Sequence, residues 1–463
     1  MAAPPTPSPL VAPRLRSLVP SAAAAAAMSS NPSSSGPAPW SGRGEQPLVL
    51  PHASLEVAGA RCGLLAGFDS LRRPYRAFPA LASNRHVETI FAAFARSLPA
   101  VALRRECLRT PDDGAVALDW VSGDDRALPR DAPVLILLPG LTGGSDDTYV
   151  RHMLLRARSK GWRVVVFNSR GCAGSPVTTA KFYSASFTGD LRQVVDHVLE
   201  RYPQSNIYAV GWSLGANILV RYLGEETDKC VLSGAVSLCN PFNLVIADED
   251  FHKGFNNVYD RALAKALRNI FKKHALLFEG LEGEYNISKA ANARSVRDFD
   301  EGLTRVSFGF KSVDDYYSNS SSSDSIKNVS IPLLCIQADN DPIAPSRGIP
   351  REDIKVVITW STMPNWRVIF LFPHCQEPKI VKNPTKIKAN PNCLLIVTPQ
   401  GGHLGWVAGE DAPFGCPWTD PIIMEFLEYV HNEKNSSTKD RISYEQQSVT
   451  QTSSPDVSVH VQR

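Results

Sequence analysis

Short apolar runs alternate with amphipathic stretches through the middle of the chain. Brief apolar runs are typical of strands buried on both faces, and apolar residues recurring every third or fourth position predict helices. We expect strands at residues 116–121, 134–138, 164–167, 207–210, 235–238, 333–338 and 394–398. We expect helices at residues 149–159, 188–201, 216–223 and 421–430. This alternation predicts an α/β fold whose mostly parallel central sheet has helices on both faces.

The two ends of the chain differ from this alternating region. Residues 1–44 are rich in Ala, Pro and Ser, and no acidic residue precedes Glu45. This composition is typical of an organelle transit peptide, and equally of a disordered segment before a second start at Met28, so plastid and cytoplasm both stay open. Residues 432–463 are polar and expected to be disordered. No apolar run reaches the roughly 18 to 20 residues of a membrane span.

Composition narrows the class of protein. A chain of 463 residues with 43% hydrophobic residues can form one large domain, which we place at residues 84–431. A net charge of +3 without a basic-aromatic pattern argues against nucleic-acid binding. Nine cysteines without a Cys-x-x-Cys pair indicate a reducing compartment and give no metal framework. We expect a small-molecule substrate, no cofactor and no metal, and the oligomeric state stays open.

A Gly-x-Ser-x-Gly pattern lies at residues 211–215, between an expected strand and an expected helix. A sharp turn from strand to helix exposes the serine hydroxyl, and the flanking glycines allow neighbouring backbone to approach. The pattern by itself is common in ordinary turns, and its placement here favours a catalytic role. We therefore predict that Ser213 is a nucleophile.

A serine nucleophile needs a base to take its proton and an acid to orient that base. Asp339 and Asp341 follow the strand at residues 333–338, and His403 follows the strand at residues 394–398 in a glycine-rich loop. We favour Asp341 as the acid and His403 as the base, since Asp339 also suits an ordinary turn. The order Ser, Asp, His is the one expected for a nucleophile on such a turn.

Backbone donors for an oxyanion are also predicted by position. A glycine-rich loop, residues 139–145, follows the strand at residues 134–138. We assign the two donors to the backbone N–H groups of Leu141 and of Leu214, the residue after the serine. The loop lacks the spacing and the Gly-Lys-Ser/Thr ending of a phosphate-binding loop, which makes a nucleotide role improbable.

These motifs, with those at residues 84–90 and 168–174, resemble the α/β-hydrolase fold superfamily, specifically the plant embryogenesis-associated branch of the AB-hydrolase family, which has bacterial and animal members. The resemblance covers the chain from about residue 84 to about residue 418. It implies a serine esterase or lipase acting on carboxylic esters, with short-chain esters, monoacylglycerols or phospholipids as substrate classes. Acyl transfer to an alcohol would use the same three side chains.

Residues 240–325 interrupt the alternation with helical, partly charged sequence and predict a cap over the site. Its large apolar residues would form an acyl pocket: Phe251, Phe255, Tyr259, Phe271, Leu276, Leu277 and Phe278. A basic helical face would be solvated or would contact a membrane or an anionic lipid head group: Arg261, Lys265, Arg268, Lys272 and Lys273.

Asp341 and His403 lie 403 − 341 = 62 positions apart, a long excursion for hydrogen-bonded partners. The dipeptide Ile354-Lys355 recurs 387 − 354 = 33 positions later as Ile387-Lys388. We infer that residues 355–387 are an atypical insertion, either a genuine segment or a gene-model artefact. If the insertion displaced His403, the chain would be a non-catalytic binding or scaffold protein with the hydrolase fold.

Overall fold

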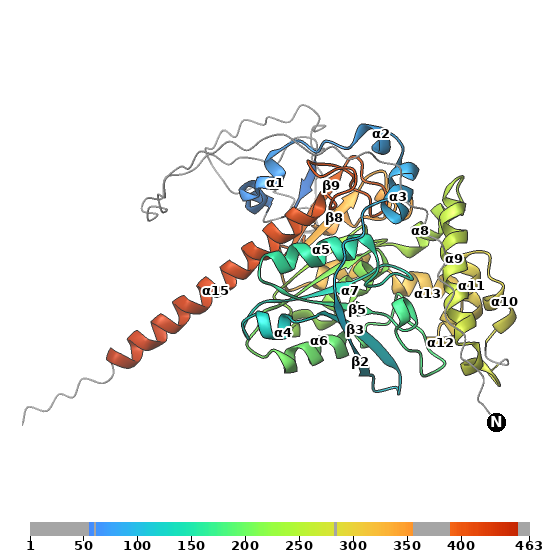
Figure 1. Ribbon diagram of the computed structural model, residues 1–463, viewed down its shortest axis with the longest axis horizontal. Coiled ribbons are helices and arrows are strands. Elements are labelled where there is room, and N and C mark those ends of the chain that lie inside the picture. Colours follow the sequence, from blue (N-terminus) through green and yellow to red (C-terminus); the bar gives the residue numbers. More distant parts are fainter. Residues whose placement is uncertain (1–54, 60–61, 282–284, 355–388, 452–463) are drawn as a thin grey trace, which may run out of the picture. The chain divides into compact units, whose positions relative to one another are not determined.

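A computed structural model describes residues 55–59, 62–281, 285–354 and 389–451 of the chain. They contain a nine-stranded sheet in the order β1-β9-β8-β7-β6-β4-β5-β3-β2 (Figure 1). Its central strands are all parallel: β4 (Val134–Leu138), β5 (Arg163–Asn168), β6 (Ile207–Trp212), β7 (Gly234–Leu238), β8 (Leu333–Ala338) and β9 (Cys393–Thr398). Antiparallel strands complete the edges: β1 (Glu56–Ala58), β2 (Leu103–Arg109) and β3 (Ala115–Val121).

The sheet contains all seven strands expected from the sequence and two edge strands that we did not predict. β1 is only three residues long, too short for a pattern to be visible. In β2, charged side chains at Arg104, Arg105 and Glu106 dominate the strand. Short or charged edge strands commonly protect a sheet from pairing with other chains. The same shortness and charge remove the apolar pattern from which a strand is predicted.

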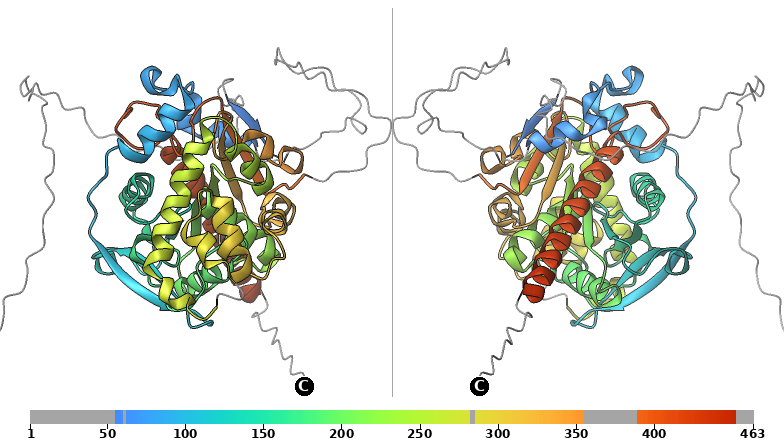
Figure 2. Two further views of the ribbon diagram at one scale, coloured as in Figure 1. Left: turned by 90° about the vertical axis from the view of Figure 1, so that its right-hand side faces the viewer. Right: turned by 90° about the vertical axis from the view of Figure 1, so that its left-hand side faces the viewer.

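Alternate residues of each central strand pack into two different hydrophobic layers. Leu135 and Leu137 of β4 point to a layer shared with α5 (Thr148–Ser159) and α15 (Thr419–Gln451). Val134 and Ile136 point to the opposite layer, shared with α6 (Gly189–Arg201) and α7 (Leu214–Glu226). In the right-hand view of Figure 2, α15 lies in front of the sheet. The predicted α/β-hydrolase architecture, with helices on both faces of a mostly parallel sheet, is therefore present.

The fold includes residues before position 84, where we expected the domain to begin. β1 pairs with β9, and the Ser70 hydroxyl of α1 (Asp69–Arg72) donates to Glu425 of α15 at 2.9 Å. Four further helices occur at different places along the chain: α2 (Pro79–Ala82), α3 (Arg85–Phe94), α4 (Asp124–Ala127) and α14 (Arg351–Ile354).

The segment between β7 and β8 is helical, and we call residues 240–325 the cap segment. Its helices are α8 (Leu244–Phe251), α9 (Asn256–Lys273), α10 (Ile287–Ala291), α11 (Val296–Phe299), α12 (Arg305–Ser307) and α13 (Val313–Ser320), with a π-helical turn at Asp300–Thr304. Aromatic contacts join α9 to its surroundings, because Phe271 packs on Phe278 and Phe299, and Phe182 stacks on Phe278. The cap segment therefore packs around a small hydrophobic core, to which Val177 and Phe182 of the chain between β5 and α6 also contribute.

The carboxyl end differs from the prediction of disorder from residue 432, since α15 continues to Gln451. Residues 432–451 contain neither Gly nor Pro, the residues that most often end helices, so their polarity alone does not stop α15. The predicted leader at residues 1–44, the insertion at residues 355–387 and the last residues, 452–463, lie outside the described residues. In the described part of the chain, no helix is long and apolar enough to cross a membrane.

Candidate active site

Ser213 occupies the turn between β6 and α7. Its φ is +52° and its ψ is −120°, a conformation that costs a non-glycine residue roughly 1 to 3 kcal/mol. A Cβ on Gly211 would lie 2.7 Å from the carbonyl oxygen of Gly215, and a Cβ on Gly215 would lie 2.2 Å from that of Leu138. Both glycines are thus required by close backbone approach, and the turn leaves the serine hydroxyl at the carboxyl edge of the sheet.

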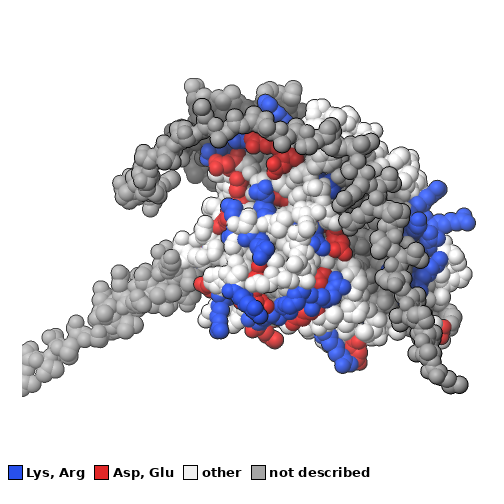
Figure 3. Space-filling model, viewed as in Figure 1, with Lys and Arg blue, Asp and Glu red and all other residues white. Residues whose placement is uncertain are grey.

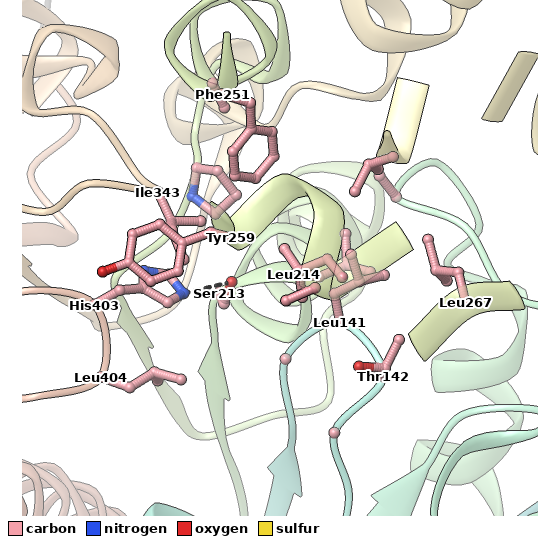
Figure 4. Close-up of a pocket in the computed structure, with 18 of the residues that line it drawn as sticks. Leu141, Thr142, Ser213, Leu214, Phe251, Tyr259, Leu267, Ile343, His403 and Leu404 are labelled. Carbon is pink, nitrogen blue, oxygen red and sulfur yellow. Dashed lines mark hydrogen bonds between the residues drawn. The ribbon is translucent and has the colours of Figure 1, made fainter. Parts of the chain in front are cut away.

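The structure brings Ser213, His403 and Asp341 into one hydrogen-bonded chain. His403 Nε2 lies 3.0 Å from Ser213 Oγ, and His403 Nδ1 lies 2.8 Å from Asp341 Oδ2 (Figure 4). Asp341 is buried, and its Oδ1 accepts hydrogen bonds from the backbone N–H groups of Ile343 and Ala344. The alternative acid, Asp339, is 63% exposed at its side chain and accepts from Ser346 Oγ instead. The geometry therefore pairs His403 with Asp341 rather than with Asp339.

The loop that carries His403 is held by α3, a contact that the sequence analysis missed. The His403 N–H donates to Thr89 Oγ1 at 2.9 Å, and the Val407 N–H donates to Glu88 Oε1 at 2.9 Å. On the other side, the Gly402 N–H donates to Asn340 Oδ1 at 3.0 Å. These partners fix the backbone on both sides of the imidazole. Residues 84–90 were noted only as a motif of the resemblance, because nothing local indicates contacts over 300 positions away.

Leu141 and Leu214, the two predicted oxyanion donors, both line the same cavity as Ser213. Leu214 is the first residue of α7, where a backbone N–H has no partner within its own helix. A Cβ on Gly140 would lie 3.2 Å from Ser213 Cβ, so the glycine-rich loop passes directly beside the serine. The position of Leu141, next to Gly140, therefore suits an N–H directed at a carbonyl bound at Ser213.

Two tyrosines fix this glycine-rich loop. The Gly140 N–H donates to the Tyr149 hydroxyl at 3.0 Å, and that hydroxyl donates to Asp147 Oδ2 at 3.1 Å. The Thr142 N–H donates to the Tyr183 hydroxyl at 2.8 Å. Burial raises the pKa values of both tyrosines well above their usual range, so both hydroxyls stay protonated. The residues on each side of Leu141 are thereby held in place, a role that the sequence pattern did not reveal.

A cavity of about 380 Å³ opens beside Ser213 and His403. Figure 4 shows Tyr259 and Ile343 near His403, and Leu141, Leu214 and Leu267 extending away on the other side of Ser213. Its walls come from the sheet's loops, from α3 and the start of α5, and from the cap segment. Most of them are apolar, and those from α9 are Tyr259, Ala262, Leu263, Leu267 and Ile270.

The apolar residues that we predicted for this pocket are only partly correct. Phe251 and Tyr259 line the cavity. Phe271 and Phe278 are buried in the small hydrophobic core beneath the cap segment, and they hold α9 in place. The remaining three, Phe255, Leu276 and Leu277, are exposed to solvent. The sequence could not show which of the apolar positions near α9 turn toward the site.

Asp300 is an acidic residue in this mostly apolar cavity wall. Its Oδ2 accepts a hydrogen bond from the Tyr317 hydroxyl at 2.9 Å, and both residues line the cavity. Burial raises the pKa of Asp300 to about 7. The charge of this wall therefore changes across the neutral pH range.

The arrangement supports attack by a hydroxyl on a carbonyl carbon. A serine on a strained turn, an imidazole within hydrogen-bond distance of it and a buried carboxylate behind the imidazole form a hydrogen-bonded chain of the kind that can carry a proton. In the described part of the chain, no cluster of three or more His, Cys, Asp or Glu side chains could hold a metal ion. Together with the sheet and its helices, this site defines the class of α/β-hydrolases.

Comparison with known proteins agrees with this class. The family model described as alpha/beta hydrolase fold matches residues 133–355. The chain is 65% identical to the embryogenesis-associated protein EMB8 of Picea glauca over 83% of this chain and 78% of that protein. It is 32% identical to the mouse phospholipase ABHD3, over 74% of this chain and 75% of that protein. It is also 32% identical to a monoacylglycerol lipase of Saccharomyces cerevisiae, over 68% of this chain and 63% of that protein.

The chain therefore belongs to the α/β-hydrolase family, in the branch that contains the embryogenesis-associated protein. It is an enzyme, a hydrolase of the esterase and lipase type. The hypothesis of a non-catalytic scaffold depended on displacement of His403, and His403 lies within hydrogen-bond distance of Ser213.

Residues on either side of the predicted insertion lie against each other. The Asn390 N–H donates to the Asp353 carbonyl at 2.9 Å, and Asn390 Nδ2 donates to the carbonyls of Ile326 and Val329, each at 2.7 Å. β8 and β9 are neighbours in the sheet, which explains how Asp341 and His403 meet despite their separation in sequence.

We expect a variant that joins Ile354 directly to Lys388 to melt within about 2 °C of the full chain and to keep ester turnover within about twofold. Only Ile354, Lys388 and Ala389 would then separate Asp353 from Asn390, the spacing of a hydrogen bond that closes one helical turn. Melting curves and esterase rates of the two proteins test this. A markedly lower melting temperature would show that residues 355–387 contribute to the fold.

Proposed function

We propose that this protein hydrolyses carboxylic esters of short- to medium-chain acyl groups through an acyl-enzyme on Ser213. The observation that carries the proposal is the chain of contacts from Asp341 through His403 to Ser213 at the wall of a mostly apolar cavity. Monoacylglycerols and phospholipids are the lipid esters to test first, because two relatives are named for lipase and phospholipase activity.

In the proposed mechanism, Ser213 Oγ attacks the ester carbonyl carbon while its proton passes to His403 Nε2. Asp341 keeps Nδ1 of His403 protonated and stabilises the imidazolium. The N–H groups of Leu141 and Leu214 bind the oxyanion, and each such donor is worth about a hundredfold or more in rate. Collapse of this intermediate expels the alcohol, which takes the proton from His403. Water then cleaves the acyl-enzyme by the same route in reverse.

The apolar cavity predicts a dependence on acyl length. Each methylene buried contributes on the order of 0.8 kcal/mol, so kcat/KM should rise by up to about fourfold for each carbon added from acetyl to about octanoyl. Hydrolysis of a p-nitrophenyl ester series measures this directly. A flat or falling series would contradict the assignment of the cavity to the acyl chain.

A pair of variants locates the acyl chain within the cavity. Leu267→Trp fills the cavity away from Ser213, so it should lower kcat/KM for octanoyl esters by about tenfold and leave acetyl esters nearly unchanged. Asn269→Trp places the same side chain on the exposed side of α9 and should leave kcat/KM unchanged for both octanoyl and acetyl esters. Equal losses for both acyl lengths in Leu267→Trp would indicate disruption of the site rather than a shortened pocket.

Acyl transfer to an alcohol requires the same three side chains and is separated from hydrolysis by its products. With glycerol present as a competing acceptor, the proposed hydrolase releases free fatty acid as its main product. Predominant formation of a glycerol ester would instead identify an acyltransferase.

A further inference from the structure

An exposed basic surface covers the outer side of α9. Four cations on this helix are solvent-exposed, and we call them the α9 basic stripe: Arg261, Lys265, Lys272 and Lys273. None of the four forms an ion pair with another described residue. The one acidic residue of α9, Asp260, is buried and accepts a hydrogen bond from the Val296 N–H. Figure 3 shows this group of Lys and Arg at its right-hand edge, where Figure 1 places α9.

This concentration of positive charge does not follow from the composition of the whole chain. The chain has 49 basic and 46 acidic residues, so an average surface would carry both signs in similar numbers. A solvated helix usually mixes its charges, because opposite charges three or four positions apart stabilise it. The charged residues exposed on α9 are all cations, which favours an anionic partner over plain solvation.

Exposed apolar side chains lie along α3 and at the amino-terminal end of α9, the helix that carries the stripe. We call them the apolar rim: Val87, Ile90 and Phe94 of α3, with Phe255 and Val258 at the start of α9. Phe94 is 86% exposed and the other four are between 39% and 49% exposed. The two helices touch here, because His86 lies 3.1 Å from the Tyr259 hydroxyl and its ring packs on Phe255 at 4.6 Å. Exposed apolar groups gathered in one region of a protein surface mark an interaction site.

The rim also borders the entrance to the cavity. Ile90 and Phe94 are exposed and line the cavity beside Ser213, and so does Ala262 of α9. A cavity lined by solvent-exposed residues opens where those residues lie. The entrance and the apolar rim therefore lie together at the amino-terminal end of α9, where the α9 basic stripe begins with Arg261.

We propose that this region docks the protein on the surface of an anionic lipid bilayer, with the entrance to the cavity facing the membrane. Amphipathic surfaces of this composition insert apolar side chains at the level of the head groups, while Lys and Arg attract anionic lipids. The partner is a bilayer rather than a protein because the region combines a helix whose exposed charges are all cations, exposed apolar residues and the opening of a mostly apolar cavity. Docking does not depend on catalysis, so it can be tested independently of the proposed function.

The test measures cosedimentation of the full chain with phosphatidylcholine vesicles, with and without about one quarter phosphatidylserine. Each cation near an anionic surface contributes about fivefold to binding, so the variant Arg261→Gln/Lys265→Gln/Lys272→Gln should bind the anionic vesicles about a hundredfold more weakly. A matched control, Arg126→Gln/Arg130→Gln/Lys229→Gln, removes three exposed charges that precede β4 and β7, at the opposite edge of the sheet from Ser213. The control should bind like the unmodified protein.

A second variant tests the apolar rim. Val87→Ser/Val258→Ser changes exposed residues that do not line the cavity, and it should weaken binding to both kinds of vesicle by about tenfold. All three variants should hydrolyse a soluble short-chain ester at the unmodified rate, which shows that they fold. Failure of the unmodified chain to bind anionic vesicles at low ionic strength would overturn the proposal. Equal losses of vesicle binding in the two triple variants would also overturn it, because binding would then depend on the net charge of the protein and not on the α9 basic stripe.

Discussion

Replacement of Ser213 by Ala should lower kcat for ester hydrolysis by about 10⁴-fold or more. Without the hydroxyl, no acyl-enzyme can form, and only the oxyanion donors and the cavity remain to promote attack by water. The Ser213 side chain has a single hydrogen bond to His403 in the described structure, and Ala keeps its Cβ. We therefore expect the melting temperature to stay within about 2 °C, so that the loss of activity is not a loss of fold.

Ser237→Ala is a matched control for this variant. Ser237 is a buried serine on the adjacent strand β7, and its hydroxyl accepts from Asn240 Nδ2 at 3.2 Å outside the cavity. Its replacement should leave kcat within about threefold of the unmodified enzyme, whatever it costs in stability. Retention of more than about a tenth of the activity in Ser213→Ala would remove Ser213 from the mechanism.

Asp341→Asn should lower kcat by about 10⁴-fold through the tautomer of His403. The amides of Ile343 and Ala344 donate to Asp341 Oδ1, so the replacing Asn keeps its carbonyl oxygen there and turns its NH₂ toward Nδ1 of His403. Nδ1 must then accept a hydrogen bond, which places the imidazole proton on Nε2. An imidazole protonated at Nε2 cannot take the proton of Ser213.

Asp339→Asn provides the control, because Asp339 lies two positions away, is exposed and contacts Ser346 rather than His403. We expect its kcat to stay within about threefold of the unmodified enzyme. Steady-state rates of the two variants, with their circular dichroism spectra, decide between the two carboxylates. A large loss in Asp339→Asn together with an active Asp341→Asn would reverse the assignment.

Much of this fold, and the grouping of Ser213, Asp341 and His403 at one site, could be predicted from local sequence. The central strands are continuous apolar runs, and the chain places Ser213, Asp341 and His403 directly after three of them. Parallel strands end at one edge of a sheet, so residues far apart in sequence had to converge there. The glycines around Ser213 gave a further local signal, because the tight turn admits no larger residue.

The supporting residues could not be predicted in the same way. Thr89 and Glu88 hold the His403 loop from a helix more than 300 positions earlier, and nothing in their own surroundings indicates it. Likewise, the sequence pattern predicts Tyr149 as an ordinary apolar position of α5, although its hydroxyl links Gly140 to Asp147. The prediction of the cavity wall was only partly correct for a related reason. Helical spacing identifies the faces of α9 but does not show which face turns toward the site.

The most direct measurement of the central claim is labelling of the full chain by a fluorophosphonate, a reagent that forms a covalent bond with an activated serine. The account predicts a single adduct, located by peptide mass spectrometry on Ser213, with loss of ester turnover in proportion to labelling. It also predicts no adduct in Ser213→Ala and a greatly slowed reaction in Asp341→Asn. Folded, unmodified protein that stays unlabelled, or an adduct on a different serine, would contradict it.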